Sequence, residues 1–142
     1  MTRITFLSNV ADRTQAAAGW LASAWKERKP VLVYAPSAEI AERLERLLWT
    51  QPATGFLPHC RADSPLAGET VVLIANNLER SPQDRCLLNL SDEVPPGFSR
   101  FEELVEIVST EDAVRLPARE RFRFYRERGY ALENRDIGAG AA

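Results

Sequence analysis

The 142-residue chain is predicted to fold as one α/β domain, with helices on both faces of a mixed, mainly parallel sheet in three layers (α/β/α). Short β-prone runs alternate with helical patterns over the first 50 residues, and this order indicates parallel strands joined by right-handed crossovers. The runs 31–34 and 71–74 are almost wholly apolar, which is typical of strands covered on both faces. Since the length suits one domain and no linker interrupts it, we expect a Rossmann-like domain over 1–136 and a disordered tail over 137–142.

The first half of the chain predicts two strands and two helices in alternation. Residues 4–7 are short, apolar and β-prone, and are expected to form the first strand. Apolar residues at helical spacing over 10–28 predict a helix that Pro30 stops. Residues 31–34 are the second expected strand, and an amphipathic helix follows over 37–49, beginning at a serine that suits an N-cap.

The second half predicts three further strands and one long C-terminal helix. Ser109 or Thr110 is expected to cap this helix, which extends to about Arg128. Gly129 then occupies the position where a left-handed residue commonly ends a helix, and residues 130–132 are expected to pack back as a short segment. The expected strands are 71–74, 86–90 and 104–108.

The turn after the first strand carries no glycine-rich phosphate motif. Residues 8–12 are Ser-Asn-Val-Ala-Asp, whereas nucleotide-binding α/β domains need glycines there so that backbone amides can approach the phosphates. We therefore expect no nucleotide site, and the sequence predicts no metal and no cofactor.

His59 and Cys60 form the one pair that could support nucleophilic catalysis. Adjacent residues of an extended chain point in different directions, however, and no orienting acid is evident beside them. Glu102, Glu103 and Glu106 could form a carboxylate cluster, but on a strand edge they are expected to be solvated. The chain is therefore predicted not to be an enzyme. No apolar stretch approaches the ~20 residues that span a membrane, so a cytoplasmic protein is expected.

Positive charge is concentrated near the C-terminus of a chain whose net charge is −2. Residues 115–128 contain six Arg against two Glu, a local charge of +4, so the remainder of the chain carries −2 − 4 = −6. A basic patch on an acidic body attracts acidic partners. On a helix that rotates about 100° per residue, Arg115, Arg119, Phe122 and Arg126 share one stripe about 60° wide.

The stripe suits two different ligands. Guanidinium groups beside an aromatic ring suit a short peptide that has carboxylates and an apolar end. They equally suit a phosphate backbone with stacked bases. Pro117 leaves a second question open, because the helix either begins at Pro117 or bends there. In the first case Arg115 lies in the preceding turn and its place on the stripe is open.

Two segments of the chain resemble the chi subunit family of bacterial DNA polymerase III. They are Leu-Trp-Thr-Gln-Pro-Ala-Thr-Gly-Phe-Leu-Pro-His at 48–59 and Ala-Arg-Glu-Arg-Phe-Arg-Phe-Tyr-Arg-Glu-Arg-Gly-Tyr at 118–130. The order of elements and the length also fit, so the resemblance covers nearly the whole chain. It implies a non-catalytic accessory subunit in DNA replication. Such a subunit links the clamp loader, through the psi subunit, to the acidic, Phe-ending C-terminal tail of single-stranded-DNA-binding protein.

The resemblance also implies a location and two sets of site residues. It places the chain at the cytoplasmic replisome, associated with the nucleoid, in indirect contact with DNA and with no membrane contact. The psi-facing surface would be Trp49, Phe56 and Pro58, whose alternative role is core packing at a helix end. The site for the acidic tail would comprise Arg115, Arg119, Phe122, Tyr125 and Arg126.

Two positions of the tail site depart from the family pattern. Arg115 stands where the family has Lys, and Phe122 where it has Tyr, so the charge and the ring are kept while a hydroxyl donor is lost. The alternative function is direct binding of single-stranded nucleic acid by the same basic helix.

Overall fold

Seven strands form one sheet in the computed structural model, which describes residues 2–50, 59–61, 72–78 and 84–137. The strand order is β3-β4-β2-β5-β6-β1-β7, and every neighbouring pair runs parallel. The described sheet is thus parallel throughout and not mixed, because the last strand returns over a helix and not through a hairpin. The strands are β1 (Arg3–Val10), β2 (Val31–Tyr34), β3 (His59–Arg61), β4 (Val72–Ala75), β5 (Cys86–Asn89), β6 (Glu103–Ser109) and β7 (Ala131–Asp136).

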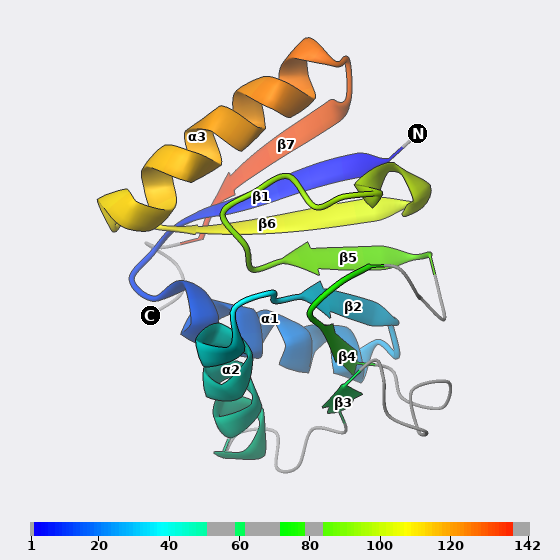
Figure 1. Cartoon of the computed structure of the whole chain (residues 1–142), viewed down its shortest axis with the longest axis vertical. Coiled ribbons are helices and arrows are strands. Elements are labelled where there is room, and N and C mark those ends of the chain that lie inside the picture. The colour runs from blue at the N-terminus through cyan, green and yellow to red at the C-terminus, as the bar shows by residue number, and fades with distance from the viewer. Residues whose placement is uncertain (1, 51–58, 62–71, 79–83, 138–142) are drawn as a thin grey trace.

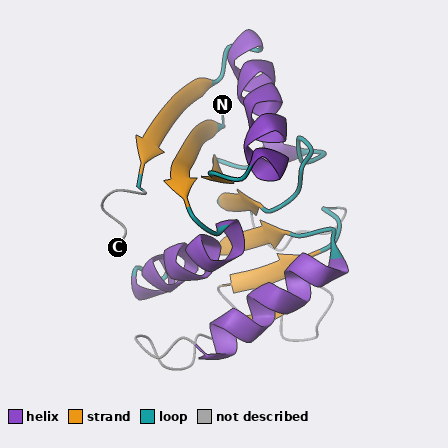
Figure 2. Cartoon of the chain, turned by 90° about the vertical axis from the view of Figure 1, so that its left-hand side faces the viewer, coloured by secondary structure: helices purple, strands orange, loops and turns teal. Residues whose placement is uncertain are grey.

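Helices cover both faces of the sheet, as Figures 1 and 2 show. On one face lie α1 (Arg13–Lys26) and α2 (Ala38–Thr50). On the other lie α3 (Asp112–Glu127) and a single 3-10 turn, η2 (Phe98–Arg100). The predicted α/β class, with its three layers, is confirmed.

Alternation along the strands divides the buried apolar side chains into two cores. Because successive residues of a strand point to opposite faces, each apolar run contributes to both cores. Val33, Ile74, Leu88 and Ile107 pack on the side of α1 and α2. Leu32, Leu73, Leu87 and Leu104 pack on the side of α3. The predicted coverage of these strands on both faces is therefore confirmed.

Helix α1 begins and ends at well-defined backbone motifs. Asp12 is its N-cap and accepts a hydrogen bond from the Gln15 amide at 3.0 Å. At the other end Arg28 is left-handed, with φ 56°, and the Lys29 amide donates to the Ala24 carbonyl at 3.0 Å. This reversal ends the helix two residues before the predicted limit at Arg28.

The C-terminal strand β7 is longer than the short segment that the sequence predicted. It pairs with β1 from Arg3 opposite Ala131 to Ser8 opposite Asp136. The first and last strands of the chain are therefore neighbours at one edge of the sheet, and α3 packs across this end of the molecule (Figure 1).

Candidate docking surface on helix α3

Helix α3 begins at Asp112 and runs through Pro117 without interruption. Glu111 is the N-cap, and its carbonyl accepts hydrogen bonds from the Val114 amide at 3.0 Å and the Arg115 amide at 2.8 Å. The predicted caps, Ser109 and Thr110, are wrong. Arg115 belongs to the helix, which settles the question that Pro117 raised.

Helix α3 ends as the sequence predicted, with Gly129 in the left-handed conformation. Gly129 has φ 82° and its amide donates to the Arg126 carbonyl at 3.1 Å, while the Tyr130 amide donates to the Tyr125 carbonyl at 3.2 Å. These two bonds form a Schellman motif, which satisfies carbonyls that the helix leaves open.

The inner side of α3 is held by a buried carboxylate. Arg121 donates to both oxygens of Glu106, through Nε to Oε2 at 3.0 Å and through Nη2 to Oε1 at 3.2 Å. The Tyr125 hydroxyl donates to Glu106 Oε2 at 2.8 Å. Glu106 and Tyr125 are both 0% exposed, and Arg121 is 3% exposed.

Two sequence-based expectations are therefore corrected. Glu106 is not solvated on a strand edge, because β6 lies inside the sheet between β5 and β1. Tyr125 is not part of a surface site, because its ring and hydroxyl are enclosed between α3 and the sheet, and burial together with Glu106 raises its pKa far above the ordinary value. The apolar residues on either side of Glu106 are the sequence signal that its carboxylate is buried. Because a buried charge requires a partner, that signal also implies an ion pair within the domain.

The outer flank of α3 carries the predicted arginine stripe, which comprises Arg115, Arg119, Phe122 and Arg126. Arg115 is half-buried and pairs with Asp112 at 2.6 Å, and this hydrogen bond lowers the pKa of the Asp112 carboxyl. Arg119 and Arg126 are exposed, and neither lies within 4.0 Å of a carboxylate among the described residues. Phe122 is half-buried, with its ring edge-on to Phe6 at a centroid distance of 5.1 Å.

The other predicted surface is only partly described. Trp49 lies near the end of α2 and is 62% exposed. Phe56 and Pro58 lie outside the described residues. His59 and Cys60 are placed on β3, but their side chains are not described.

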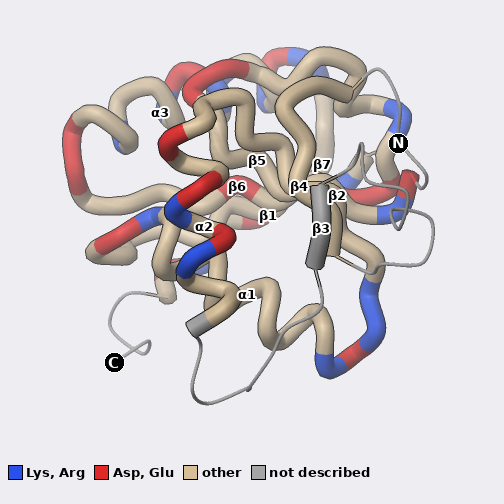
Figure 3. Tube along the Cα trace, turned by 60° about the horizontal axis from the view of Figure 1, so that its bottom comes forward, with Lys and Arg blue, Asp and Glu red and all other residues tan. Residues whose placement is uncertain are grey.

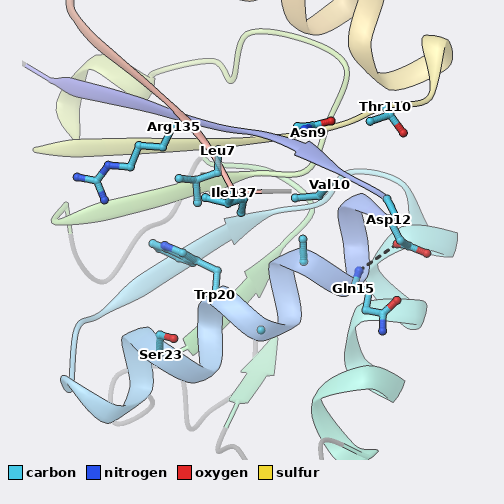
Figure 4. Close-up of a pocket in the computed structure, with 13 residues that line it drawn as sticks. Leu7, Asn9, Val10, Asp12, Gln15, Trp20, Ser23, Thr110, Arg135 and Ile137 are labelled. Carbon is cyan, nitrogen blue, oxygen red and sulfur yellow. Dashed lines mark hydrogen bonds between the residues drawn. The ribbon is translucent and has the colours of Figure 1, made fainter. Parts of the chain in front are cut away.

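A groove of about 810 Å³ opens between α1 and the carboxyl ends of β1 and β7 (Figure 4). In doubly wound folds phosphate groups bind at this end of the first strand, against the N-terminus of the helix that follows. Here the Asp12 carboxylate already occupies that N-terminus, and it is hydrogen-bonded to Arg43 at 3.0 Å. A phosphate group bound at this end of β1 would face this negative charge.

The described residues contain no group of three or more His, Cys, Asp or Glu that could hold a metal ion. Among them, no helix has the length and apolar character needed to cross a membrane.

Comparison with known proteins identifies the family. The family model described as "DNA polymerase III chi subunit, HolC" matches residues 1–133. The chain is 30% identical to DNA polymerase III subunit chi of Pseudomonas aeruginosa, over 94% of this chain and 96% of that protein. It is 35% identical to the Escherichia coli subunit chi, over 78% of this chain and 76% of that protein. The Haemophilus influenzae subunit chi is 30% identical over 87% of each chain. The chain therefore belongs to the DNA polymerase III chi subunit family.

Proposed function

We propose that this chi-family subunit is a non-catalytic adaptor of the DNA polymerase III holoenzyme, acting in the cytoplasm at the replisome. It would link the clamp loader, through the psi subunit, to the acidic C-terminal tail of single-stranded-DNA-binding protein. The observation that carries this proposal is the arginine stripe of α3, where two exposed guanidinium groups flank an aromatic ring.

The spacing of the stripe suits an extended acidic peptide. Arg119 and Arg126 are seven positions apart, which on a helix is about 10 Å along the axis. An extended peptide rises about 3.3 Å per residue, so roughly three residues bridge the two arginines. Carboxylates of the tail would pair with Arg119 and Arg126, while the terminal phenylalanine ring packs beside Phe122. Phe122 cannot donate the hydrogen bond that a tyrosine hydroxyl would supply.

The two proposed binding surfaces lie on opposite faces of the sheet. Trp49 is on α2, which packs with α1, and the arginine stripe is on α3. Positive and negative residues alternate along α2 (Figure 3), so an apolar contact centred on Trp49 is expected to dominate there. Separate faces allow psi and the tail to bind at once, as an adaptor requires.

Calorimetric titration with a synthetic peptide that carries several Asp residues and ends in Phe tests the tail site. Arg119→Ala is expected to weaken binding about tenfold or more, since a sheltered charge-assisted pair contributes ~1.5–3 kcal/mol. Arg123→Ala is the matched control, because Arg123 is an exposed arginine of the same helix, outside the stripe and 3.7 Å from Glu120. Equal affinities for wild type and Arg119→Ala would contradict the site.

Direct binding of single-stranded nucleic acid by α3 is the competing function. It requires tight binding without a partner protein and an affinity that falls steeply with salt. The charge of −6 outside residues 115–128 opposes it. A filter-binding series from low to moderate salt with an oligonucleotide separates the two functions, because the adaptor predicts little retention at any salt concentration.

A further inference from the structure

Glu106 lies on β6 in the interior of the domain, and side chains of three other elements surround its carboxylate. Besides Arg121 and Tyr125 of α3, the Asn89 amide nitrogen of β5 donates to both carboxylate oxygens, at 3.1 and 3.0 Å. Arg13 Nη2, from the first turn of α1, lies 3.9 Å from Oε1. A carboxylate with 0% exposure thus gathers groups from α3, β5 and α1.

The two buried arginines depend on Glu106 to different degrees. Arg13 donates to three backbone carbonyls, those of Ile107 at 2.9 Å, Asn89 at 3.0 Å and Ser91 at 2.9 Å. Arg121 has no such support: its only ion pair among the described residues is with Glu106, and its Nη1 has no hydrogen-bond partner. Loss of the Glu106 charge would therefore leave Arg121 as an unpaired buried cation.

Among the described residues, Arg121 and Tyr125 make the only side-chain hydrogen bonds between α3 and the sheet. Arg121 and Tyr125 are one turn apart on the inner face, and both bind the same carboxylate. Phe122 and Arg126 of the stripe directly follow these two residues, so any rotation of the anchored pair moves the stripe by the same angle.

We propose that Glu106 is the positioning residue of the docking surface. It does not touch the ligand; it fixes the rotation of α3 and so the place at which Arg119 and Arg126 meet the ligand's carboxylates. This inference rests on the proposed function for the identity of the ligand, but the positioning of α3 can be measured without any ligand.

Glu106→Gln is the sharpest variant, because it keeps the shape of the side chain and removes its charge. Arg121, Tyr125 and Asn89 all donate hydrogen bonds to the Glu106 carboxylate. The amide nitrogen of the glutamine is itself a donor, so it cannot accept the hydrogen bonds that the replaced carboxylate oxygen accepted. Ile107→Val is the matched control. Ile107 is the next residue of β6, is 0% exposed, and packs in the core under α1 and α2, so its truncation lowers stability without touching α3.

The experiment measures two quantities at a temperature where circular dichroism shows every variant fully folded. They are the affinity for the acidic, Phe-ending peptide and the native hydrogen exchange of the α3 amides. Glu106→Gln is expected to weaken binding of the peptide about fivefold and to speed exchange in α3 more than in the other helices. Ile107→Val is expected to leave the affinity unchanged and to speed exchange in α3 no more than elsewhere in the domain. Tyr125→Phe removes one of the bonds to Glu106 with the ring retained, and is expected to show smaller changes in the same direction.

The outcomes separate the two proposals. If wild type does not bind the peptide, the proposed ligand is wrong, and the exchange measurement alone decides the role of Glu106. Wild-type affinity and wild-type exchange in Glu106→Gln would overturn the positioning role. If Glu106→Gln does not fold, the same two results in folded Tyr125→Phe would overturn it. Equal losses of affinity in Glu106→Gln and Ile107→Val would show that Glu106 affects binding only through the stability of the domain, and would contradict the positioning role.

Discussion

Gly129 has a left-handed backbone conformation, whereas Gly19 lies within the regular helix α1. Gly129 has φ 82°, and an added Cβ would meet no atom within 4 Å, so only the backbone conformation opposes a side chain there. Gly19 lies within α1, where an added Cβ would also meet nothing within 4 Å. The same substitution at the two positions therefore separates backbone preference from packing.

We expect Gly129→Ala to lower the free energy of unfolding by about 1 kcal/mol, because an alanine in the left-handed region is strained. Gly19→Ala is expected to raise it by up to about 1 kcal/mol, because alanine is the better helix former. Urea unfolding followed by circular dichroism measures both. Changes of the same sign in the two variants would contradict this account.

Glu106 also shows what a residue-level interpretation of sequence misses. The sequence predicts a solvated glutamate within the run Leu-Val-Glu-Ile-Val, although the run itself indicates a buried strand. Its partner, Arg121, is one of the six arginines that give residues 115–128 their positive charge. Sequence periodicity places a residue on a face, but it cannot pair two charges 15 positions apart on different elements.

At the scale of elements, Asp12 connects two helices. Its carboxylate caps α1 and is hydrogen-bonded to Arg43 of α2 at 3.0 Å. The hydrogen bond from Arg43 is the largest of the effects that hold the pKa of Asp12 below its ordinary value of 3.8. Since the folded state then binds fewer protons than the unfolded chain, this stabilisation is present above about pH 3.8 and is lost as the pH falls further.

Asp12→Asn keeps an N-cap side chain and removes the charge. We expect wild type to be more stable than this variant at pH 7, with the difference shrinking as the pH falls from 4 toward 3, in urea unfolding at each pH. Arg43→Gln should reproduce the loss at pH 7, and the double variant should add little to either single one. A difference that stays constant with pH would show that the ion pair is not its cause.

The elements that the sequence predicted are those with a strong apolar period. The buried runs of β2 and β4 and the amphipathic α2 were found close to their limits, because their side chains face a core. Strand β7 was largely missed. Its residues are mostly exposed and polar, and its pairing with β1 depends on backbone hydrogen bonds that no side-chain pattern reports.

At the scale of the whole molecule, the sheet lies between α2, which carries Trp49, and α3, which carries the arginine stripe. Arg115, Arg119, Phe122 and Arg126 could be placed together from helical geometry alone. Their orientation toward solvent could not, because it depends on contacts between α3 and β6 that join distant parts of the chain.

We expect Trp49→Ala to weaken binding of the psi subunit and to leave the affinity for the acidic peptide unchanged. Arg119→Ala should do the reverse, because α2 and α3 lie on opposite faces of the sheet. Titration of each variant with each partner measures the four affinities. Loss of both partners in either variant would contradict two separate surfaces.

The neighbouring positions of β1 and β7 have a consequence for synthesis. β1 is made first, yet its two partners in the sheet are β6 and β7, which the ribosome makes last. A nascent chain that stops before residue 103 leaves β1 without either neighbour, and it also lacks the residues of α3. A chain of this length carries none of the residues of the arginine stripe, so it cannot compete with the complete protein for the proposed acidic tail, although it already contains Trp49.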